Sequence, residues 1–203
     1  MFVLDWMTED VITVKKEDSI ENLTNLMNIN KINHLPVVSN NKVIGIITRS
    51  DVRQATTSLK FDKTKSKVND FMIRDVIIVK KYDTLEDVLL LIYNKKVGAL
   101  PVIDEENNLI GIITRHDILK AFIKITGLDK SGITVILKIE DKPEKIERLI
   151  HTLNQTKCKV LSFFTLEKDN NFRLISIRFD CINKMYIENI LIKEGHEIYK
   201  PWE

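Results

Sequence analysis

The spacing of apolar and polar residues predicts the same order of elements twice within residues 5–126. Each time, a short strand precedes a helix whose apolar residues recur every three or four positions, and two strands and a second helix follow. Asp18-Ser19-Ile20-Glu21 is a capping signature before the first helix, and Ser39-Asn40-Asn41 is typical of a tight turn. In the first copy we expect a strand at 11–14 (Val11, Ile12 and Val14), a helix from residue 20, strands at 34–38 and 43–48, and a helix after residue 48.

The two halves of this pattern are also similar in sequence. The matching stretches are DWMTEDVITVKK (5–16) and DFMIRDVIIVKK (70–81), HLPVV (34–38) and ALPVI (99–103), and GIITRSD (45–51) and GIITRHD (111–117). They indicate a duplicated unit of roughly 55 residues. A unit so small leaves much of its surface exposed, so we expect the two copies to pack about a pseudo-two-fold axis and to form clefts in equivalent pairs. The expected bounds are 5–58 for the first copy, 59–69 for the linker and 70–126 for the second copy.

A different pattern begins after Gly127. Ile133, Val135, Leu137 and Ile139 alternate as in a half-buried strand. The following elements are expected to be a helix at 143–156, strands at 159–167 and 172–179, a helix at 183–194 and a final strand from residue 196. This order predicts a ferredoxin-like βαββαβ domain over residues 131–203, so the fold class is α+β (α/β). His151 and His196 are interpreted as surface residues of this part.

Composition narrows the range of functions. The chain has 203 residues, of which 44% are apolar, and its 31 basic and 29 acidic side chains leave a net charge of +2. That balance gives no reason to expect nucleic acid or an anionic membrane as a partner. The longest apolar run, 88–93, is too short to span a bilayer, and the N-terminus does not read as a signal peptide. Cys158 and Cys181 lack metal or disulfide-framework spacing, which favours a reducing cytoplasm.

The repeated GIITR-x-D phrase allows two interpretations. Thr48 can cap a helix while Asp51 returns the hydrogen bond from the third helical position, and Thr114 and Asp117 can do the same in the second copy. Alternatively, a strand that runs into a helix presents free N–H groups to a phosphate, and the carboxylate can accept both hydrogen bonds from a vicinal diol such as that of ribose. Gly45 would let another group approach the strand closely. The spacing alone is compatible with both.

Several motifs together resemble a known family. Each copy carries D-V-I-x-V near its start, L-P-V in the middle and G-I-I-T-R-x-D at its end, and this combination resembles the CBS domain. Two such copies in tandem, over residues 5–125, resemble a Bateman module. The resemblance implies a regulatory module that binds an adenosine-containing ligand, namely AMP, ADP, ATP or S-adenosylmethionine, in the clefts between the repeats.

The resemblance also implies site residues. Asp51 and Asp117 would contact ribose, with Thr48 and Thr114 as their partner hydroxyls, and the Asp of one copy would face the adenine pocket of the other. His34 takes the place of a basic phosphate ligand, whereas the second copy has Ala99, so the two clefts are expected to differ. The implied adenine-pocket residues are Met7, Ile12, Ile32 and Asn33 in the first copy and Met72, Ile77, Val97 and Gly98 in the second.

Residues 131–203 resemble an ACT domain in their order of elements. Ligand-binding members often carry D-x-P-G-x-L, and this chain has DKPEKI, with Glu144 in place of glycine. A side chain there obstructs an amino-acid carboxylate, so we expect this domain to support dimerisation rather than amino-acid sensing. A CBS pair followed by an ACT-like domain resembles the acetoin utilization protein AcuB family, which implies a role in acetoin utilisation.

The sequence contains no recognisable catalytic or metal-binding motif. G-x-S-x-G, a Walker loop and H-E-x-x-H are absent, and the four histidines lack ligand spacing. We therefore expect a non-enzymatic, cytoplasmic homodimer that senses an adenine nucleotide or S-adenosylmethionine and acts in trans on an enzyme or regulator. Two alternatives stay open: an amino-acid sensor that uses the ACT-like domain, and a structural dimerisation scaffold in which both heptads serve only as helix caps.

Overall fold

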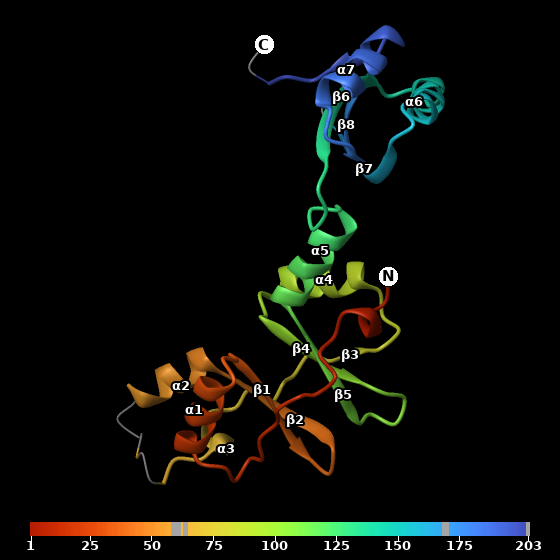
Figure 1. Cartoon of the computed structure of the whole chain (residues 1–203). Coiled ribbons are helices and arrows are strands. Elements are labelled where there is room, and N and C mark those ends of the chain that lie inside the picture. The colour runs from red at the N-terminus through yellow and green to blue at the C-terminus, as the bar shows by residue number, and fades with distance from the viewer. Residues whose placement is uncertain (58–61, 63–64, 168–170, 202–203) are drawn as a thin grey trace. The chain divides into compact units, whose positions relative to one another are not determined.

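The computed structural model describes residues 1–57, 62, 65–167 and 171–201 (Figure 1). The chain divides into two compact units, Met1–Leu119 and Lys120–Glu203, with the division inside one helix. Residues 59–61, 63 and 64 of the expected linker at 59–69 lie outside the described residues, as do residues 168–170 of the turn expected before the strand at 172. No helix in the described parts of the chain is both long and apolar enough to cross a membrane.

The first unit contains two similar sets of elements. Its hairpins, β1 with β2 and β4 with β5, are antiparallel, and each has a register shift at the equivalent place, Val37/Val38 and Val102/Ile103. Asn40 and Asn41 turn the first hairpin with φ of 49° and 62°, which asparagine tolerates better than most residues. The elements are η1 (Val3–Asp5), α1 (Ile20–Ile29), β1 (His34–Ser39), β2 (Lys42–Thr48), α2 (Arg49–Thr56), α3 (Val68–Phe71), β3 (Val79–Lys80), α4 (Leu85–Lys95), β4 (Ala99–Ile103), β5 (Leu109–Thr114) and α5 (Arg115–Ile125).

The prediction of a strand at 11–14 is wrong. Only Val14 pairs, in a parallel bridge with Val37, through hydrogen bonds of 3.1 and 2.9 Å. The chain turns immediately afterwards, because the main-chain N–H of Lys15 donates to Asp18 Oδ2 at 2.8 Å. The apolar side chains of Val11 and Ile12 are therefore not explained by strand pairing. The equivalent strand of the second copy, β3, has two residues.

The opening stretch of each copy is hydrogen-bonded to the other copy. Near the N-terminus, the N–H of Val3 donates to the oxygen of Asp83 at 3.0 Å, and Thr8 exchanges two hydrogen bonds of 2.9 Å with Ile112 of β5. Figure 1 shows this segment in red beside β5 and β3. The equivalent stretch before β3 does the same in reverse, since Ile73 exchanges bonds of 2.8 and 2.9 Å with Ile46 of β2. We refer to this arrangement as the reciprocal exchange.

Glycine in the GIITR phrase makes the reciprocal exchange possible. A Cβ added to Gly111 would lie 2.6 Å from Met7 Sδ and 3.2 Å from the main-chain oxygen of Thr8. The corresponding distances at Gly45 are 2.7 Å to Met72 Sδ and 3.2 Å to an oxygen of the crossing chain. Close approach to these glycines, expected from the sequence, is thus made by a methionine of the other copy.

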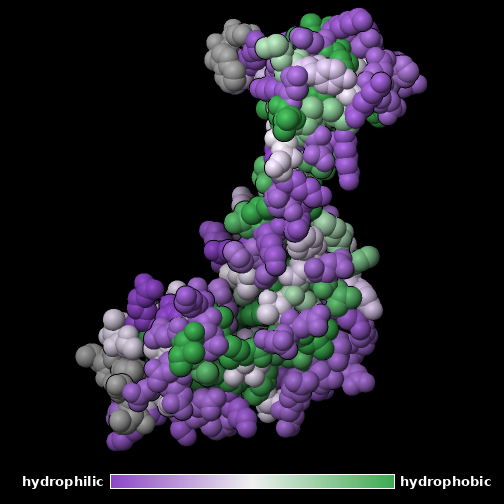
Figure 2. Space-filling model, in the orientation of Figure 1, coloured by the Kyte–Doolittle hydropathy of each residue, from purple (hydrophilic) through white to green (hydrophobic). Residues whose placement is uncertain are grey.

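The reciprocal exchange extends to the hydrophobic core. Met72, from the opening of the second copy, and Val68, which precedes it in α3, belong to the core of the first copy. Val3 is fully buried although it is the third residue of the chain. Figure 2 shows that the visible face of this unit is mostly hydrophilic, with apolar surface towards its middle. The core of the first copy consists of Val14, Ile20, Leu23, Met27, Leu35, Val37, Ile47, Val52, Val68 and Met72.

The second unit has the expected order of strand, helix, strand, strand, helix and strand. Its antiparallel sheet has the strand order β7-β8-β6-β9. Alternate β6 residues such as Val135 and Leu137 are buried, and Pro143 stands in the first turn of α6, where a missing N–H has no cost. The elements are β6 (Ile133–Glu140), α6 (Pro143–Gln155), β7 (Lys159–Glu167), β8 (Phe172–Asp180), α7 (Lys184–Lys193) and β9 (Glu197–Ile198).

The interpretation of His196 as a surface residue is wrong. Only 8% of it is exposed, and its Nε2 lies 3.0 Å from the hydroxyl of Thr152, which is completely buried. Burial lowers the pKa of His196, and the positive charge of Arg148 lowers it further. The sequence did not indicate this burial, because His196 stands in a polar turn just before β9.

Candidate ligand clefts of the first unit

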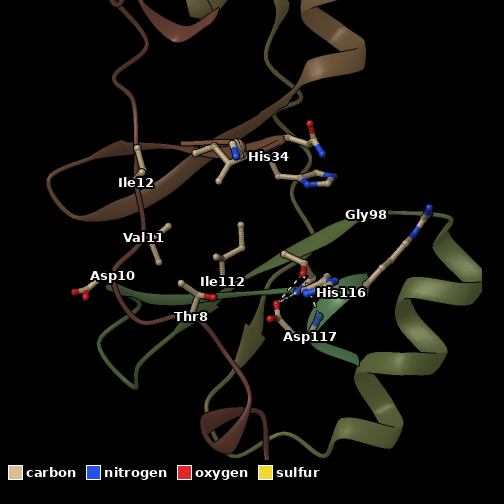
Figure 3. A pocket seen from close by; sticks show the side chains of 14 residues that line it. Thr8, Asp10, Val11, Ile12, His34, Gly98, Ile112, His116 and Asp117 are labelled. Atoms are coloured by element: carbon tan, nitrogen blue, oxygen red, sulfur yellow. Dashed lines mark hydrogen bonds between the residues drawn. The ribbon is translucent and has the colours of Figure 1, made fainter. Parts of the chain in front are cut away.

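Residues from both copies line a cavity of about 680 Å³, which we call the first cavity (Figure 3). Figure 3 shows Val11 and Ile12 on one side of the open space and Asp117 on another. The two sides come from different copies, because 11–12 opens the first copy and Asp117 lies in the first turn of α5. The lining residues are Thr8, Asp10, Val11, Ile12, Lys31, Ile32, Asn33, His34, Gly98, Ile112, Thr114, Arg115, His116 and Asp117.

The polar end of the first cavity is a capped helix start. Asp117 Oδ2 accepts hydrogen bonds from the N–H of Thr114 at 2.8 Å and from its hydroxyl at 2.7 Å, and that hydroxyl lies 3.3 Å from the N–H of Asp117. No described residue donates a hydrogen bond to Oδ1 of Asp117. The cap and a ligand contact are therefore compatible, since one carboxylate oxygen fixes the side chain and the other can accept hydrogen bonds from a ligand.

The other walls of the first cavity are mostly apolar. Val11, Ile12, Ile32 and Ile112 supply aliphatic surface suited to a flat ring. Asn33 adds a directional group, because its side-chain oxygen accepts from Arg49 Nε at 2.8 Å. With the oxygen engaged, the amide N–H groups of Asn33 are the part left to meet a ligand, and they match the acceptor nitrogens of a purine.

A second cavity of about 520 Å³ lies at positions equivalent by the repeat. Four residues, Asn33, His34, Gly98 and Arg115, line both cavities, so the two adjoin. The complete lining of the second is Asn33, His34, Ile46, Thr48, Arg49, Ser50, Arg53, Ile73, Lys96, Val97, Gly98, Ala99 and Arg115. Thr48 makes the same cap with Asp51 as in the second copy, with distances of 2.8, 2.7 and 3.3 Å.

His34 stands where the two cavities adjoin. Burial lowers its pKa, Arg115 lowers it further, and Asp51 acts in the opposite direction. The net shift of the pKa is downward, which favours the neutral imidazole. A Cβ on Gly98 would lie 2.3 Å from His34 Nε2 and 2.8 Å from Cε1. Glycine at 98 thus makes the space that the imidazole occupies.

Replacing Gly98 by Ala is expected to displace the His34 ring and to destabilise the first unit by about 1–3 kcal/mol, the usual cost of overpacking. His34→Ala removes the obstructing ring, so the double variant should lose less stability than the sum of the two single variants. Guanidinium unfolding of the four proteins measures this coupling. Strictly additive losses would show that Gly98 and His34 do not interact.

The structure brings together only part of the site expected from sequence. Met7 and Met72 line neither cavity, because each lies beside a glycine of the other copy. Asp51 and Ile77 are also outside both linings. Of the expected residues, the first cavity contains Ile12, Ile32, Asn33, His34, Gly98, Thr114 and Asp117, and the second contains Asn33, His34, Thr48, Val97 and Gly98.

Several lining residues were not expected. Thr8, Asp10 and Val11 enter the first cavity with the crossing chain, and Arg53 enters the second from α2. They line the cavities only because the two copies cross in space. The sequence did show that Thr8 and Ile73 hold equivalent positions in the repeat, and they line the first and the second cavity, respectively. Among the described residues there is no group of three or more His, Cys, Asp or Glu side chains that could hold a metal ion.

Comparison with known proteins gives consistent matches for the first unit. The CBS domain family model matches residues 3–57 and 68–124. Inosine-5'-monophosphate dehydrogenase of Methanocaldococcus jannaschii is 46% identical over 113 residues, which are 55% of this chain and 22% of that enzyme. An uncharacterized protein of the same organism, MJ0188, is 29% identical over 150 residues, 74% of this chain and 49% of its own length. The chain thus spans half or less of these relatives.

Solved structures of CBS pairs are similar in fold. The CBS pair of protein MJ0100, in complex with 5'-methylthioadenosine and S-adenosyl-L-methionine, has a TM-score of 0.56 and 27% identity and covers 64% of this chain and 98% of its own. CBSX2 in complex with AMP has a TM-score of 0.55 and 28% identity, and the match covers 61% of this chain and 97% of CBSX2. A putative acetoin utilization protein (AcuB) from Vibrio cholerae has a TM-score of 0.57 and 28% identity, and the match covers 64% of this chain and 95% of that protein.

Proposed function

We propose, from the premise that the chain belongs to the CBS domain family, that it is a regulatory protein without catalytic activity that binds an adenosine-containing ligand in the first cavity. One observation carries the proposal. The first cavity joins the Thr114/Asp117 cap of the second copy to an apolar wall with Asn33 from the first copy. A polar clamp opposite an apolar slot is the arrangement that a nucleoside requires.

Each part of the ligand has a suitable group in the first cavity. The free oxygen of Asp117 accepts hydrogen bonds from the ribose diol, because ionised carboxylates form strong hydrogen bonds with hydroxyl donors. The purine fills the space beside Ile12 and Ile32, and the amide of Asn33 donates to one of its ring nitrogens. CBS-pair structures that bind 5'-methylthioadenosine, S-adenosyl-L-methionine and AMP support this assignment.

Regulation follows from the position of the ligand between two copies. A ligand that contacts Asp117 from one side and Ile12 from the other is sensitive to the spacing of the copies, so it binds one arrangement better and shifts the population towards it. The output then acts in trans on an enzyme or regulator. The likeness to the AcuB structure, over 64% of this chain, supports acetoin utilisation as the process concerned.

The second unit supplies a means of pairing. We assign it to ACT-like domains, with residues 131–203 as its bounds, and to homodimer formation together with the CBS domains. Strand β7 is at an edge of the sheet, where free main-chain groups can join a second sheet. Asp141, the first residue of DKPEKI, forms an ion pair of 2.6 Å with Arg173, so its carboxylate is already engaged, which supports pairing over amino-acid binding.

Isothermal titration calorimetry tests the proposal. The purified chain is titrated with adenosine, AMP, ATP and S-adenosylmethionine, with guanosine as the control for base recognition and free amino acids as the control for the second unit. We expect binding of at least one adenosine-containing ligand with dissociation constants in the micromolar range, or about −8 kcal/mol. Failure of all four, or heat from an amino acid alone, would contradict the proposal.

A further inference from the structure

The two cysteines of the chain lie opposite each other at one end of the β7–β8 pair. Strands β7 and β8 are antiparallel, and Lys159 pairs with Asp180 at the end of their ladder. Cys158 and Cys181 occupy the next position outwards on the two strands. Residues directly opposite each other in such a pair have Cβ atoms about 4.5–5.5 Å apart, so the register makes the two side chains neighbours. Their spacing in the sequence gave no indication of this.

The structure around each cysteine holds its main chain in place. The N–H of Cys158 donates to the hydroxyl of Thr156 at 3.3 Å, and that hydroxyl donates to the main-chain oxygen of Leu153 at the end of α6 at 2.7 Å. Cys181 lies two residues before Asn183, whose side chain caps the first turn of α7. The pair therefore joins two fixed turns, one between α6 and β7 and the other between β8 and α7.

The two thiols have different surroundings. Both are partly buried against the core of the second unit, and both are free thiols. Burial raises the pKa of Cys158, and a hydrogen bond with the thiol of Cys181 and the negative charge of Asp180 raise it further. The Sγ of Cys181 makes an exposed contact of 3.9 Å with the main-chain oxygen of Asn183. Because the thiolate is the reactive form, Cys158 is the weaker nucleophile, and Cys181 is the thiol that a reagent meets first.

We propose that Cys158 and Cys181 form a redox-active pair that closes into an intramolecular disulfide. The oxidant is a low-molecular-weight disulfide, such as glutathione disulfide. The thiolate of Cys181 attacks one sulfur of the oxidant, which breaks its S–S bond and releases one glutathione. Cys158 then gives its proton to water and attacks the Sγ of Cys181, which releases the second glutathione. Two protein thiols are thereby oxidised, and one glutathione disulfide is reduced to two thiols.

The register permits this bond without a large movement of the chain. Disulfides join residues whose Cα atoms are about 4.4–6.8 Å apart, and opposite residues of antiparallel strands are about 4.5–5.5 Å apart. The sequence has no third cysteine, so no other disulfide can form within one chain. Neither cysteine lines the first or the second cavity, so the inference does not rest on the proposed function.

Mass spectrometry of the intact chain under non-reducing conditions tests the proposal. After treatment with excess glutathione disulfide in mildly alkaline buffer, the wild type should lose two hydrogen atoms and retain no glutathione, because the second thiol displaces the first adduct. Cys158→Ser and Cys181→Ser should each retain one glutathione. Two glutathiones retained by the wild type, or a disulfide that forms only between chains, would overturn the proposal.

The matched control keeps two thiols and moves one of them. Cys181→Ser combined with Ile182→Cys places the thiol at the next residue, where the side chain is 93% exposed and a substitution leaves the core intact. Closure should be slower by about tenfold or more, because the moved thiol no longer lies opposite Cys158. Equal rates of closure in the control and the wild type would show that the register does not determine the pairing.

Closure should also stabilise the second unit. A disulfide restricts the unfolded chain, so the oxidised wild type should melt about 5 °C or more above the reduced protein. Differential scanning calorimetry of the whole chain, with and without dithiothreitol, measures the shift. Cys158→Ser treated with the same oxidant should show no such shift, and a shift of equal size in that variant would contradict the assignment of the effect to this pair.

Discussion

Asp117→Ala should weaken the binding of adenosine or AMP about a hundredfold or more. Two hydrogen bonds from the ribose diol to one carboxylate oxygen are lost, each worth about 1.5–3 kcal/mol because the acceptor is charged. Calorimetry measures the change in dissociation constant directly. The effect is expected to be large because no other carboxylate except Asp10 lines the first cavity.

The matched control for this prediction is Asp51→Ala. The two carboxylates make the same capping bonds with the same distances, so both variants should lose a similar amount of stability, about 1 kcal/mol. Only Asp117 lines the first cavity. If both variants lose affinity equally, the loss reflects weakened caps, and if neither does, Asp117 is not the ribose ligand.

Val3→Asp should destabilise the first unit by about 3 kcal/mol or more, despite its place near the chain terminus. Val3 has no exposed surface, and an uncompensated buried charge costs several kcal/mol. Its N–H also donates to Asp83, so the segment cannot move away without losing that bond. Guanidinium unfolding followed by far-ultraviolet circular dichroism measures the loss.

Leu4→Asp provides the comparison for Val3→Asp, since Leu4 is 40% exposed and precedes an exposed acid in the same turn. It introduces the same charge one residue away and should cost less than about 1 kcal/mol, as surface substitutions usually do. Similar losses in the two variants would mean that the N-terminal segment is not inserted into the second copy.

The sequence predicts best what local interactions decide. The hairpin turn at Asn40-Asn41 and the caps at Thr48 and Thr114 depend on residues within three or four positions, and all agree with the structure. Residues 131–201 also have the expected order of elements, because each of the strands and helices there has a clear period.

The conformation of residues 11–14, predicted as a strand, could not be obtained from the sequence, for a physical reason. Val11 and Ile12 have high strand propensity, but the chain on either side is engaged elsewhere, at Thr8 by the other copy and at Lys15 by a turn. No ladder partner is left for them, so they line the first cavity instead. The family resemblance indicated Ile12 alone as a site residue, whereas the crossing of the chain determined the conformation of both residues.

The same limitation applied to the site. The residues before L-P-V and the Thr/Asp pair of the second copy were predicted to meet, and the first cavity contains both. The presence of Arg53 in the wall of the second cavity was not predicted, because Arg53 lies on a helix surface and resembles an ordinary solvated arginine in the sequence. Its place there depends on which helix faces which loop, and that is a property of tertiary packing.

The reciprocal exchange has a consequence for cooperativity. Unfolding of either copy withdraws Val68 and Met72 from one core or Val3 from the other, so neither copy retains a complete interior by itself. Partial unfolding confined to one copy is thereby disfavoured, and we expect residues 1–119, which form one compact unit, to unfold as a single cooperative unit rather than as two independent foldons. Binding free energy gained in one cavity then protects the amides of both copies against hydrogen exchange, including those that no ligand touches.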